Sequence, residues 1–149
     1  MKLIELLNMK DSKYRIPVTI GLNDTVFMAV QKLAEHDRGS LPVCDEKGEL
    51  KGIITERDIA RKCFSKSGES IRIRIKNIMS TEVAVGQPND DLNYALNVMK
   101  QKRIRHLPIV DKKKVIGMIS MRDLLGIQLE ESDTKVRFLS DYISGGSQS

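Results

Sequence analysis

The chain has 149 residues, of which 40% are apolar and 30% are charged, a balance typical of globular proteins. No apolar run reaches about 18 residues, and Glu5 interrupts the N-terminal apolar run early, so neither a transmembrane helix nor a signal peptide is expected. We therefore expect a cytoplasmic protein without a membrane partner. The net charge of +5 is compatible with anionic ligands, whereas 4% aromatic residues and no Trp argue against a stacking platform for single-stranded nucleic acid.

The first half of the chain predicts the order strand, helix, strand, strand, helix. RIPVTI (15–20) is a short extended piece, and apolar residues recur at helical spacing after Asp24. LPVC (41–44) and LKGIIT (50–55) flank a polar turn, as the strands of a hairpin do, and a second helix follows. The residues expected to face inward on the two helices are Val26, Val30, Leu33 and Ala34, and then Ile59 and Cys63.

The second half repeats this order. An offset of 66 aligns Leu41-Pro42 with Leu107-Pro108, and an offset of 65, after one lost residue, aligns Arg57-Asp58 with Arg122-Asp123. The expected pieces are an extended segment at 82–87, strands at 107–110 and 115–120, and helices with Leu92, Ala95, Leu96 and Met99, and then Leu124, Ile127 and Gln128, facing inward. A half of roughly 60 residues would be marginal alone. We therefore expect an α/β (α+β) fold of two pseudo-twofold-related β-α-β-β-α repeats packed sheet to sheet.

The segments between and after the repeats complete the predicted organisation. IRIRIKNIM (71–79) alternates apolar and basic residues, which predicts an extended joint, or the entry to the second half, with Arg72, Arg74 and Lys76 facing out. DTKVRFLSDYI (133–143) predicts a last helix before a frayed GGSQS tail. The expected division of the chain is 1–70 for the first repeat with its N-terminal segment, 71–130 for the second repeat, and 131–149 for the C-terminal helix and disordered tail.

The stretches TERD (55–58) and SMRD (120–123) occupy the same place in the two repeats, where a strand gives way to a helix. Thr or Ser followed three residues later by an acidic residue is typical of a capping box, which satisfies N–H groups at a helix start. Asp is shorter than the Glu or Gln that the box prefers, and this is also where α/β proteins place ligands. A carboxylate repels phosphate but accepts both hydroxyls of a ribose. Asp58 and Asp123 therefore suit a cap, a ribose site, or both.

A basic segment, KRIRHLP (102–108), precedes the strand that pairs with the one ending in SMRD. Its side chains could supply the phosphate partner of a sugar-binding Asp123, and the plainer interpretation is a solvated basic loop. The equivalent first-half segment, DRGSLP (37–42), has fewer basic residues, so the second site should suit a phosphorylated ligand better. The candidate residues of the two segments are Arg105, His106, Arg38, Gly39 and Ser40.

Other chemical motifs are missing from the sequence. There is no GxGxxG or GxxxxGK[ST] phosphate loop, no nucleophile elbow, and no repeated acid pair that would indicate hydrolysis. A metal pair from His36 and His106 is not expected. Cys44 and Cys63 form no CxxC pair and are predicted to be reduced packing thiols, and the seven Met residues are predicted to fill gaps in the core. We therefore expect no enzyme.

At this point the residues carry a family resemblance. Two copies of a roughly 60-residue unit with RHLPIVD, an apolar Gly-containing strand and an [ST]-x-x-D helix start resemble the CBS (cystathionine β-synthase) domain, and a tandem pair resembles a Bateman module. The segment NIMSTEVAVGQPNDDLNYAL (77–96) resembles the opening of a second copy, and the resemblance covers about residues 3–130.

The resemblance implies a regulatory sensor that binds AMP, ADP or ATP in two clefts between the copies, with S-adenosylmethionine or NAD as alternative ligands. Asp58 and Asp123 would hold ribose hydroxyls, with Thr55 and Ser120 beside the sugar or phosphate. The base pockets and walls would be lined by Pro17, Thr19, Val83, Val85, Pro108 and Ile109. The residues facing phosphates would be Arg38, Arg105 and His106, joined by Arg57 and Arg122 unless these form salt bridges between subunits. Such modules commonly form homodimers, and the regulated target protein is not identified.

Two other functions remain open from the sequence. A basic protein could bind nucleic acid through Arg72, Arg74 and Lys76 and through 112–114, although this is the less favoured partner. A partner subunit with degenerate clefts would bind a protein tightly and no small ligand.

Overall fold

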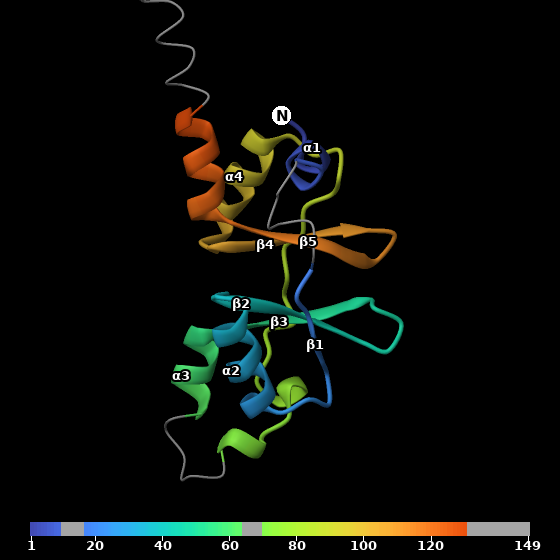
Figure 1. The fold of residues 1–149 in the computed structure, drawn as a ribbon, viewed down its shortest axis with the longest axis vertical. Coiled ribbons are helices and arrows are strands. Elements are labelled where there is room, and N and C mark those ends of the chain that lie inside the picture. Colours follow the sequence, from blue (N-terminus) through green and yellow to red (C-terminus); the bar gives the residue numbers. More distant parts are fainter. Residues whose placement is uncertain (10–16, 64–69, 131–149) are drawn as a thin grey trace, which may run out of the picture.

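The computed structural model describes residues 1–9, 17–63 and 70–130. It consists of two α+β units stacked with their sheets toward each other, and the larger helices of both units lie on the outer sides (Figure 1). In chain order the elements are α1 (Leu3–Leu7), β1 (Ile20–Gly21), α2 (Val26–Glu35), β2 (Ser40–Cys44), β3 (Leu50–Thr55), α3 (Glu56–Cys63), the 3₁₀ turns η1 (Ser70–Arg72) and η2 (Ile75–Asn77), α4 (Leu92–Lys102), β4 (His106–Asp111) and β5 (Lys114–Ser120), followed by a helix over 121–130.

The first unit is built on a three-stranded sheet of order β1-β2-β3. β1 runs parallel to β2, and β2 and β3 form the predicted antiparallel hairpin. The hydroxyl of Thr25 caps α2 by accepting a hydrogen bond from the backbone N–H of Met28. α2 buries Val26, Ala29 and Leu33, and α3 buries Ile59 and Cys63, as predicted for Val26, Leu33 and the α3 pair.

The prediction for two residues of α2 was wrong, because Val30 is 46% exposed and Ala34 is exposed. α2 carries two apolar stripes one residue apart, and only the stripe containing Ala29 meets the sheet. The other stripe starts at Phe27, which is 50% exposed, and continues through Val30 and Ala34 on the outer side. Apolar spacing alone could not decide between the two.

The second unit repeats the hairpin with β4 and β5 in an antiparallel pair. Its α4 buries all four predicted inward-facing residues: Leu92, Ala95, Leu96 and Met99. In the helix at 121–130 Leu124 is buried, whereas Ile127 and Gln128 are half-buried. Only Gly86 of the expected 82–87 strand pairs, in a parallel bridge with Ile109. The predicted helix at 133–143 and the tail lie outside the described residues.

The short segments that precede the two halves each complete the core of the other half. α1 contributes Leu3, Leu6 and Leu7 to the core of the second unit, and the N–H of Leu3 donates to the carbonyl of Asp90 at 2.9 Å. η2 contributes Ile75 to the core of the first unit. The expected division at residue 70 stays a prediction, while the packing of α1 crosses it. Neither core can therefore form from one contiguous half of the chain.

The joint at 71–79 is not the extended segment that its alternation predicted. It forms η1 and η2, because Ile75 and Ile78 are both buried and their spacing of three suits a tight helical turn rather than a strand. Arg72, Arg74 and Lys76 are exposed, as predicted.

The two sheets contact each other directly. The hairpin ends are joined by a β-bridge between Glu49 and Lys114, and the N–H of Leu50 donates to the carbonyl of Lys113 at 3.2 Å. In the interior the hydroxyl of Ser40 lies 3.3 Å from the sulfur of Met118. The sheet-to-sheet arrangement therefore brings β2 and β4–β5 side chains into one interior. No described helix combines the length and the apolar character that crossing a membrane would need.

Candidate functional site

The helix start at TERD is a complete capping box. The N–H of Asp58 donates to Oγ1 of Thr55 at 3.0 Å, and the N–H of Thr55 donates to Oδ2 of Asp58 at 3.1 Å. Nζ of Lys62, one turn along α3, lies 3.9 Å from Oδ1 of Asp58. The predicted capping role of TERD is confirmed: Oδ2 of Asp58 belongs to the cap, and Oδ1 lies beside Lys62.

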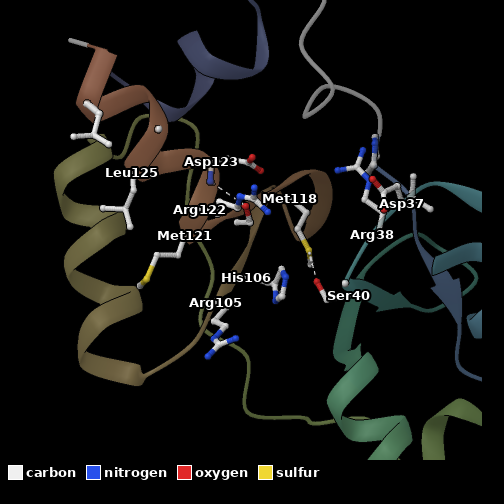
Figure 2. Close-up of a pocket in the computed structure, with 16 residues that line it drawn as sticks. Asp37, Arg38, Ser40, Arg105, His106, Met118, Met121, Arg122, Asp123 and Leu125 are labelled. Atoms are coloured by element: carbon white, nitrogen blue, oxygen red, sulfur yellow. Dashed lines mark hydrogen bonds between the residues drawn. The ribbon is translucent and has the colours of Figure 1, made fainter. Parts of the chain in front are cut away.

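The helix start at SMRD uses the same first contact. The N–H of Asp123 donates to Oγ of Ser120 at 3.1 Å, which confirms that Ser120 caps the helix at 121–130. Figure 2 shows the Asp123 carboxylate pointing away from this helix start, on the side of the cavity that faces Arg38. Asp123 is therefore placed to serve as a helix-start residue and as part of a cavity wall.

A cavity of about 920 Å³ lies beside SMRD, between the two units, and we call it the larger cavity (Figure 2). Its described lining residues are Pro17, Val18, Asp37, Arg38, Gly39, Ser40, Arg105, His106, Met118, Ser120, Met121, Arg122, Asp123, Leu125, Gly126 and Leu129. The first unit supplies 17–18 and 37–40, and the second unit supplies the rest. The cavity therefore exists only where both units meet.

A cavity of about 370 Å³ lies beside TERD, and we call it the smaller cavity. Its described lining residues are Gly39, Ile53, Thr55, Glu56, Arg57, Asp58, Ser80, Glu82, Val83, Ala84, Arg103, Ile104, Arg105 and His106. The two cavities share Gly39, Arg105 and His106. They are thus related by the internal repeat and adjoin at one wall.

Most of the predicted site residues line one of these cavities. Those in the larger cavity are Pro17, Arg38, Ser40, Arg105, His106, Ser120, Arg122 and Asp123, and those in the smaller cavity are Thr55, Asp58, Val83, Arg105 and His106. Arg57, predicted to face phosphate or a partner subunit, lines the smaller cavity. Lining a cavity places these residues at a candidate site, and their roles in binding stay predictions.

Four predicted residues lie outside both sets of lining residues. Pro108 and Ile109 are buried in β4, where Ile109 belongs to the core of the second unit. Val85 is 37% exposed, and the backbone carbonyl of Thr19 accepts a hydrogen bond from Nζ of Lys32 at 2.7 Å. Val18 and Ala84, which the sequence did not single out, line the cavities next to the predicted Pro17 and Val83.

The larger cavity has an apolar wall that the sequence reasoning missed. Met121, Leu125 and Leu129 recur every four residues along the helix at 121–130, and Met118 lies opposite on β5. Their spacing could have indicated this stripe, because Leu124 and Ile127 face the core on the other side of the same helix. The prediction that the Met residues fill core gaps is wrong for Met1, Met9 and Met28, which are exposed, whereas Met121 both lines the cavity and packs against the core of the second unit.

The two cavities differ in charge. Among the described lining residues, the larger cavity carries three arginines (Arg38, Arg105 and Arg122) against Asp37 and Asp123. The smaller cavity carries three arginines against three carboxylates, which are Glu56, Asp58 and Glu82. The larger cavity therefore has an excess of positive charge and the smaller one does not, and the better binding of an anionic ligand in the larger cavity stays a prediction.

His106 lies in the shared wall and is half-buried. Burial lowers the pKa of His106 below its ordinary value of 6.5, and the positive charge of Arg105 lowers it further, while Asp123 and Glu56 act in the opposite direction. The imidazole is therefore neutral near pH 7 and can both donate and accept a hydrogen bond. Among the described residues, no three His, Cys, Asp or Glu side chains cluster closely enough to hold a metal ion. Cys44 and Cys63 are buried free thiols, as predicted.

Comparison with known proteins gives one consistent result. A family model described as "CBS domain" matches residues 12–65 and 75–130. The chain is 36% identical to the CBS domain-containing protein YhcV of Bacillus subtilis, over 78% of this chain and 82% of that protein. It is 34% identical to the mitochondrial CBS domain-containing protein CBSX3 of Arabidopsis thaliana, over 83% of this chain and 62% of that protein.

Solved structures agree. A putative signal-transduction protein with CBS domains from Burkholderia ambifaria superposes with a TM-score of 0.75 at 34% identity, covering 84% of this chain and 91% of that one. The CBS domain pair of protein MJ0100, solved in complex with 5′-methylthioadenosine and S-adenosyl-L-methionine, superposes with a TM-score of 0.74 at 25% identity, covering 88% and 98%.

Proposed function

The chain belongs to the CBS-domain family as a tandem pair of such domains, and from this premise we propose that it is a regulatory module that binds an adenosine nucleotide in the larger cavity. The observation that carries the proposal is the composition of that cavity. One wall holds an aspartate at a strand-to-helix joint, arginines come from both units, and a third side is apolar. A phosphorylated nucleoside offers hydroxyls, negative charge and a flat base, one for each surface.

The ribose is assigned to Asp123. An ionised carboxylate only accepts hydrogen bonds, so it pairs with the two hydroxyls of a ribose and repels a phosphate. Asp123 is anchored at its N–H by Ser120 at 3.1 Å, which fixes the start of the helix that carries it. The sugar would therefore meet a carboxylate on a rigid element.

The phosphates are assigned to Arg38, Arg105 and Arg122, because guanidinium groups bind phosphate oxygens with paired donors. Neutral His106 adds one further donor between the units. The base is assigned to the apolar wall of Met118, Met121 and Leu125, joined by Pro17 and Val18 from the first unit. A volume of about 920 Å³ lies within the range of small-molecule sites.

The comparison with MJ0100 supports an adenosine group, since that protein was solved with two adenosine compounds. The arginines favour a phosphorylated ligand over S-adenosylmethionine in this chain. A second ligand in the smaller cavity is proposed to bind more weakly, because that cavity is smaller and its positive and negative charges balance. The family resemblance also proposes a homodimer and a target protein. The cytoplasmic location and the absence of catalysis are proposals from the sequence.

Thermal unfolding with added ligands tests the proposal. AMP, ADP or ATP should raise the melting temperature, and a ligand at 100 times its Kd should add about 2.7 kcal/mol of stability. The 2′-deoxy form of the best nucleotide should stabilise less, because Asp123 would lose one of its two hydroxyl partners. Inorganic triphosphate is the control for charge without ribose. The proposal fails if no adenine nucleotide, S-adenosylmethionine or NAD shifts melting at millimolar concentration.

A further inference from the structure

One side chain, His106, faces both cavities. It is the first residue of β4, and it lines the larger and the smaller cavity together with Arg105 and Gly39. Figure 2 shows the ring standing between β4 and Ser40 of the first unit. A Cβ on Gly39 would lie 3.3 Å from Nε2 of His106. The imidazole therefore packs against the backbone of Gly39, just before β2. The ring thus forms part of the partition between the cavities.

The charged groups around the ring come from several elements. Arg105 precedes it on the same segment, and Asp123, on the helix at 121–130, and Glu56, at the start of α3, are near enough to raise its pKa. The opposing loop adds Arg38 in the larger cavity. Asp123 belongs to the larger cavity and Glu56 to the smaller one. The imidazole therefore already interacts with one carboxylate from each side.

We propose that His106 couples the two cavities, so that an anion bound in either one draws a proton onto the imidazole and the resulting cation favours an anion in the other. The inference rests on the proposed function only in taking the ligand to be anionic. Two bound anions would otherwise repel each other through the thin partition. A shared proton reverses the sign of that interaction.

The coupling has a defined dependence on pH. Burial and Arg105 keep the imidazole neutral near pH 7 before ligand binds. An anion binds better to the protein in which His106 is protonated. The affinity for the anion therefore rises as pH falls toward the titration midpoint of His106 in the unliganded protein, and it levels off below that midpoint. By reciprocity, the anion raises the pKa of His106 by the same free energy. Coupling between cavities should therefore be strong near pH 6 and weak near pH 8.

The two histidines of the chain make the test direct by NMR. The imidazole C–H resonances of His36 and His106 are titrated with pH, with and without inorganic pyrophosphate, which needs no adenosine site. The midpoint of His106 should move to higher pH with pyrophosphate. His36, exposed at the end of α2 and outside both sets of lining residues, should not move and serves as the internal control.

A matched pair of variants then addresses each cavity. Arg122 lines only the larger cavity and Arg57 only the smaller one, so Arg122→Gln and Arg57→Gln each weaken one site. Pyrophosphate should still raise the His106 midpoint in both variants. A shift that survives in only one variant would assign His106 to a single cavity and overturn the coupling.

Calorimetric titration measures the coupling itself. The quantity of interest is the ratio of the first to the second dissociation constant for pyrophosphate. In the parent protein this ratio should be at least about fivefold larger at pH 6 than at pH 8. In His106→Gln this ratio should not change with pH, whereas His36→Gln should behave as the parent. If ADP raises the melting temperature but neither anion moves the His106 midpoint, the coupling is wrong and the proposed function stands. If pyrophosphate moves the midpoint and no adenosine compound binds, the proposed function is wrong and the coupling stands.

Discussion

The two helix starts of this protein have almost the same sequence and different surroundings. At TERD the carboxylate of Asp58 closes a reciprocal cap with Thr55 and has Lys62 at 3.9 Å. At SMRD the hydroxyl of Ser120 caps the helix, and Asp123 stands in a cavity about two and a half times as large. A repeated motif can thus keep one structural role in both copies while the two copies differ in the volume and charge of the adjoining cavity.

The difference arises from the neighbours of each motif. The helix after SMRD presents Met121 and Leu125 to its cavity, and the opposing loop adds Arg38. α3 after TERD presents Glu56 and Arg57, and the opposing segment adds Glu82. The second aspartate therefore adjoins an apolar wall and an excess of positive charge, whereas around the first the positive and negative charges balance.

The largest expected effect tests whether the two cores depend equally on α1 and η2, the segments that each pack into the unit on the other side of the division. Leu3→Ala and Ile75→Ala each truncate a fully buried side chain, one in the core of each unit, and each should cost about 2–5 kcal/mol of unfolding free energy. Urea denaturation measures this cost. Ile71→Ala, at a residue that is 51% exposed, is the control and should stay within about 0.5 kcal/mol. A comparably small loss for Leu3→Ala would mean that α1 does not hold the second unit together.

A smaller effect should separate Gly52, in β3 of the first unit, from Gly86, which pairs with β4 of the second unit. A Cβ at Gly52 would lie 2.7 Å from the backbone carbonyl of Ser80, which also accepts the N–H of Ile53 at 2.9 Å, so Gly52→Ala should cost about 1–3 kcal/mol. At Gly86 the Cβ would meet the ends of the Leu3 and Leu107 side chains, which can rotate, so Gly86→Ala should cost less. Gly126→Ala, with nothing within 4 Å, is the control and should add up to about 1 kcal/mol in its helix. Equal losses at Gly52 and Gly86 would contradict this contact geometry.

The smallest effect concerns pH. The pKa of His106 is lowered in the folded state by burial and by Arg105, so the unfolded chain binds more protons as pH falls through 6.5. The ligand-free protein should therefore lose stability on acidification below about pH 7. His106→Gln should remove part of this slope, and His36→Gln should keep it, as measured by urea denaturation between pH 5 and 8. A steeper slope in His106→Gln than in the parent would show that the sign of the shift is reversed.

Much of the fold followed from local pattern. The four hairpin strands were predicted within one residue of β2 to β5, because two short apolar runs around a polar turn leave little other choice. The sequence could not show which of the two apolar stripes on α2 faces inward. Ala29 and Val30 are both apolar and each belongs to a stripe at helical spacing, so only the packing of the folded protein distinguishes them. The place of α1 in the second core was not predictable either, because local sequence does not say which half of the chain a short amphipathic segment contacts.

The candidate site was predictable as far as the repeat reached. The internal alignment placed Asp58 and Asp123 at equivalent joints, and the structure puts each beside a cavity. The apolar wall was missed because Met121 and Leu125 were not distinguished from the core residues of the same helix. The shared position of His106 depends on how the two units stack, which no local pattern describes.

The most direct measurement compares the two aspartates. Asp123→Asn and Asp58→Asn are each purified, and the rise in melting temperature with saturating ADP is measured against the parent protein. The account predicts that Asp123→Asn loses most of the rise. It predicts that Asp58→Asn melts lower without ligand, because its cap is weakened, yet keeps most of the rise. Equal losses in the two variants, or a larger loss in Asp58→Asn, would contradict the assignment of the nucleotide to the larger cavity.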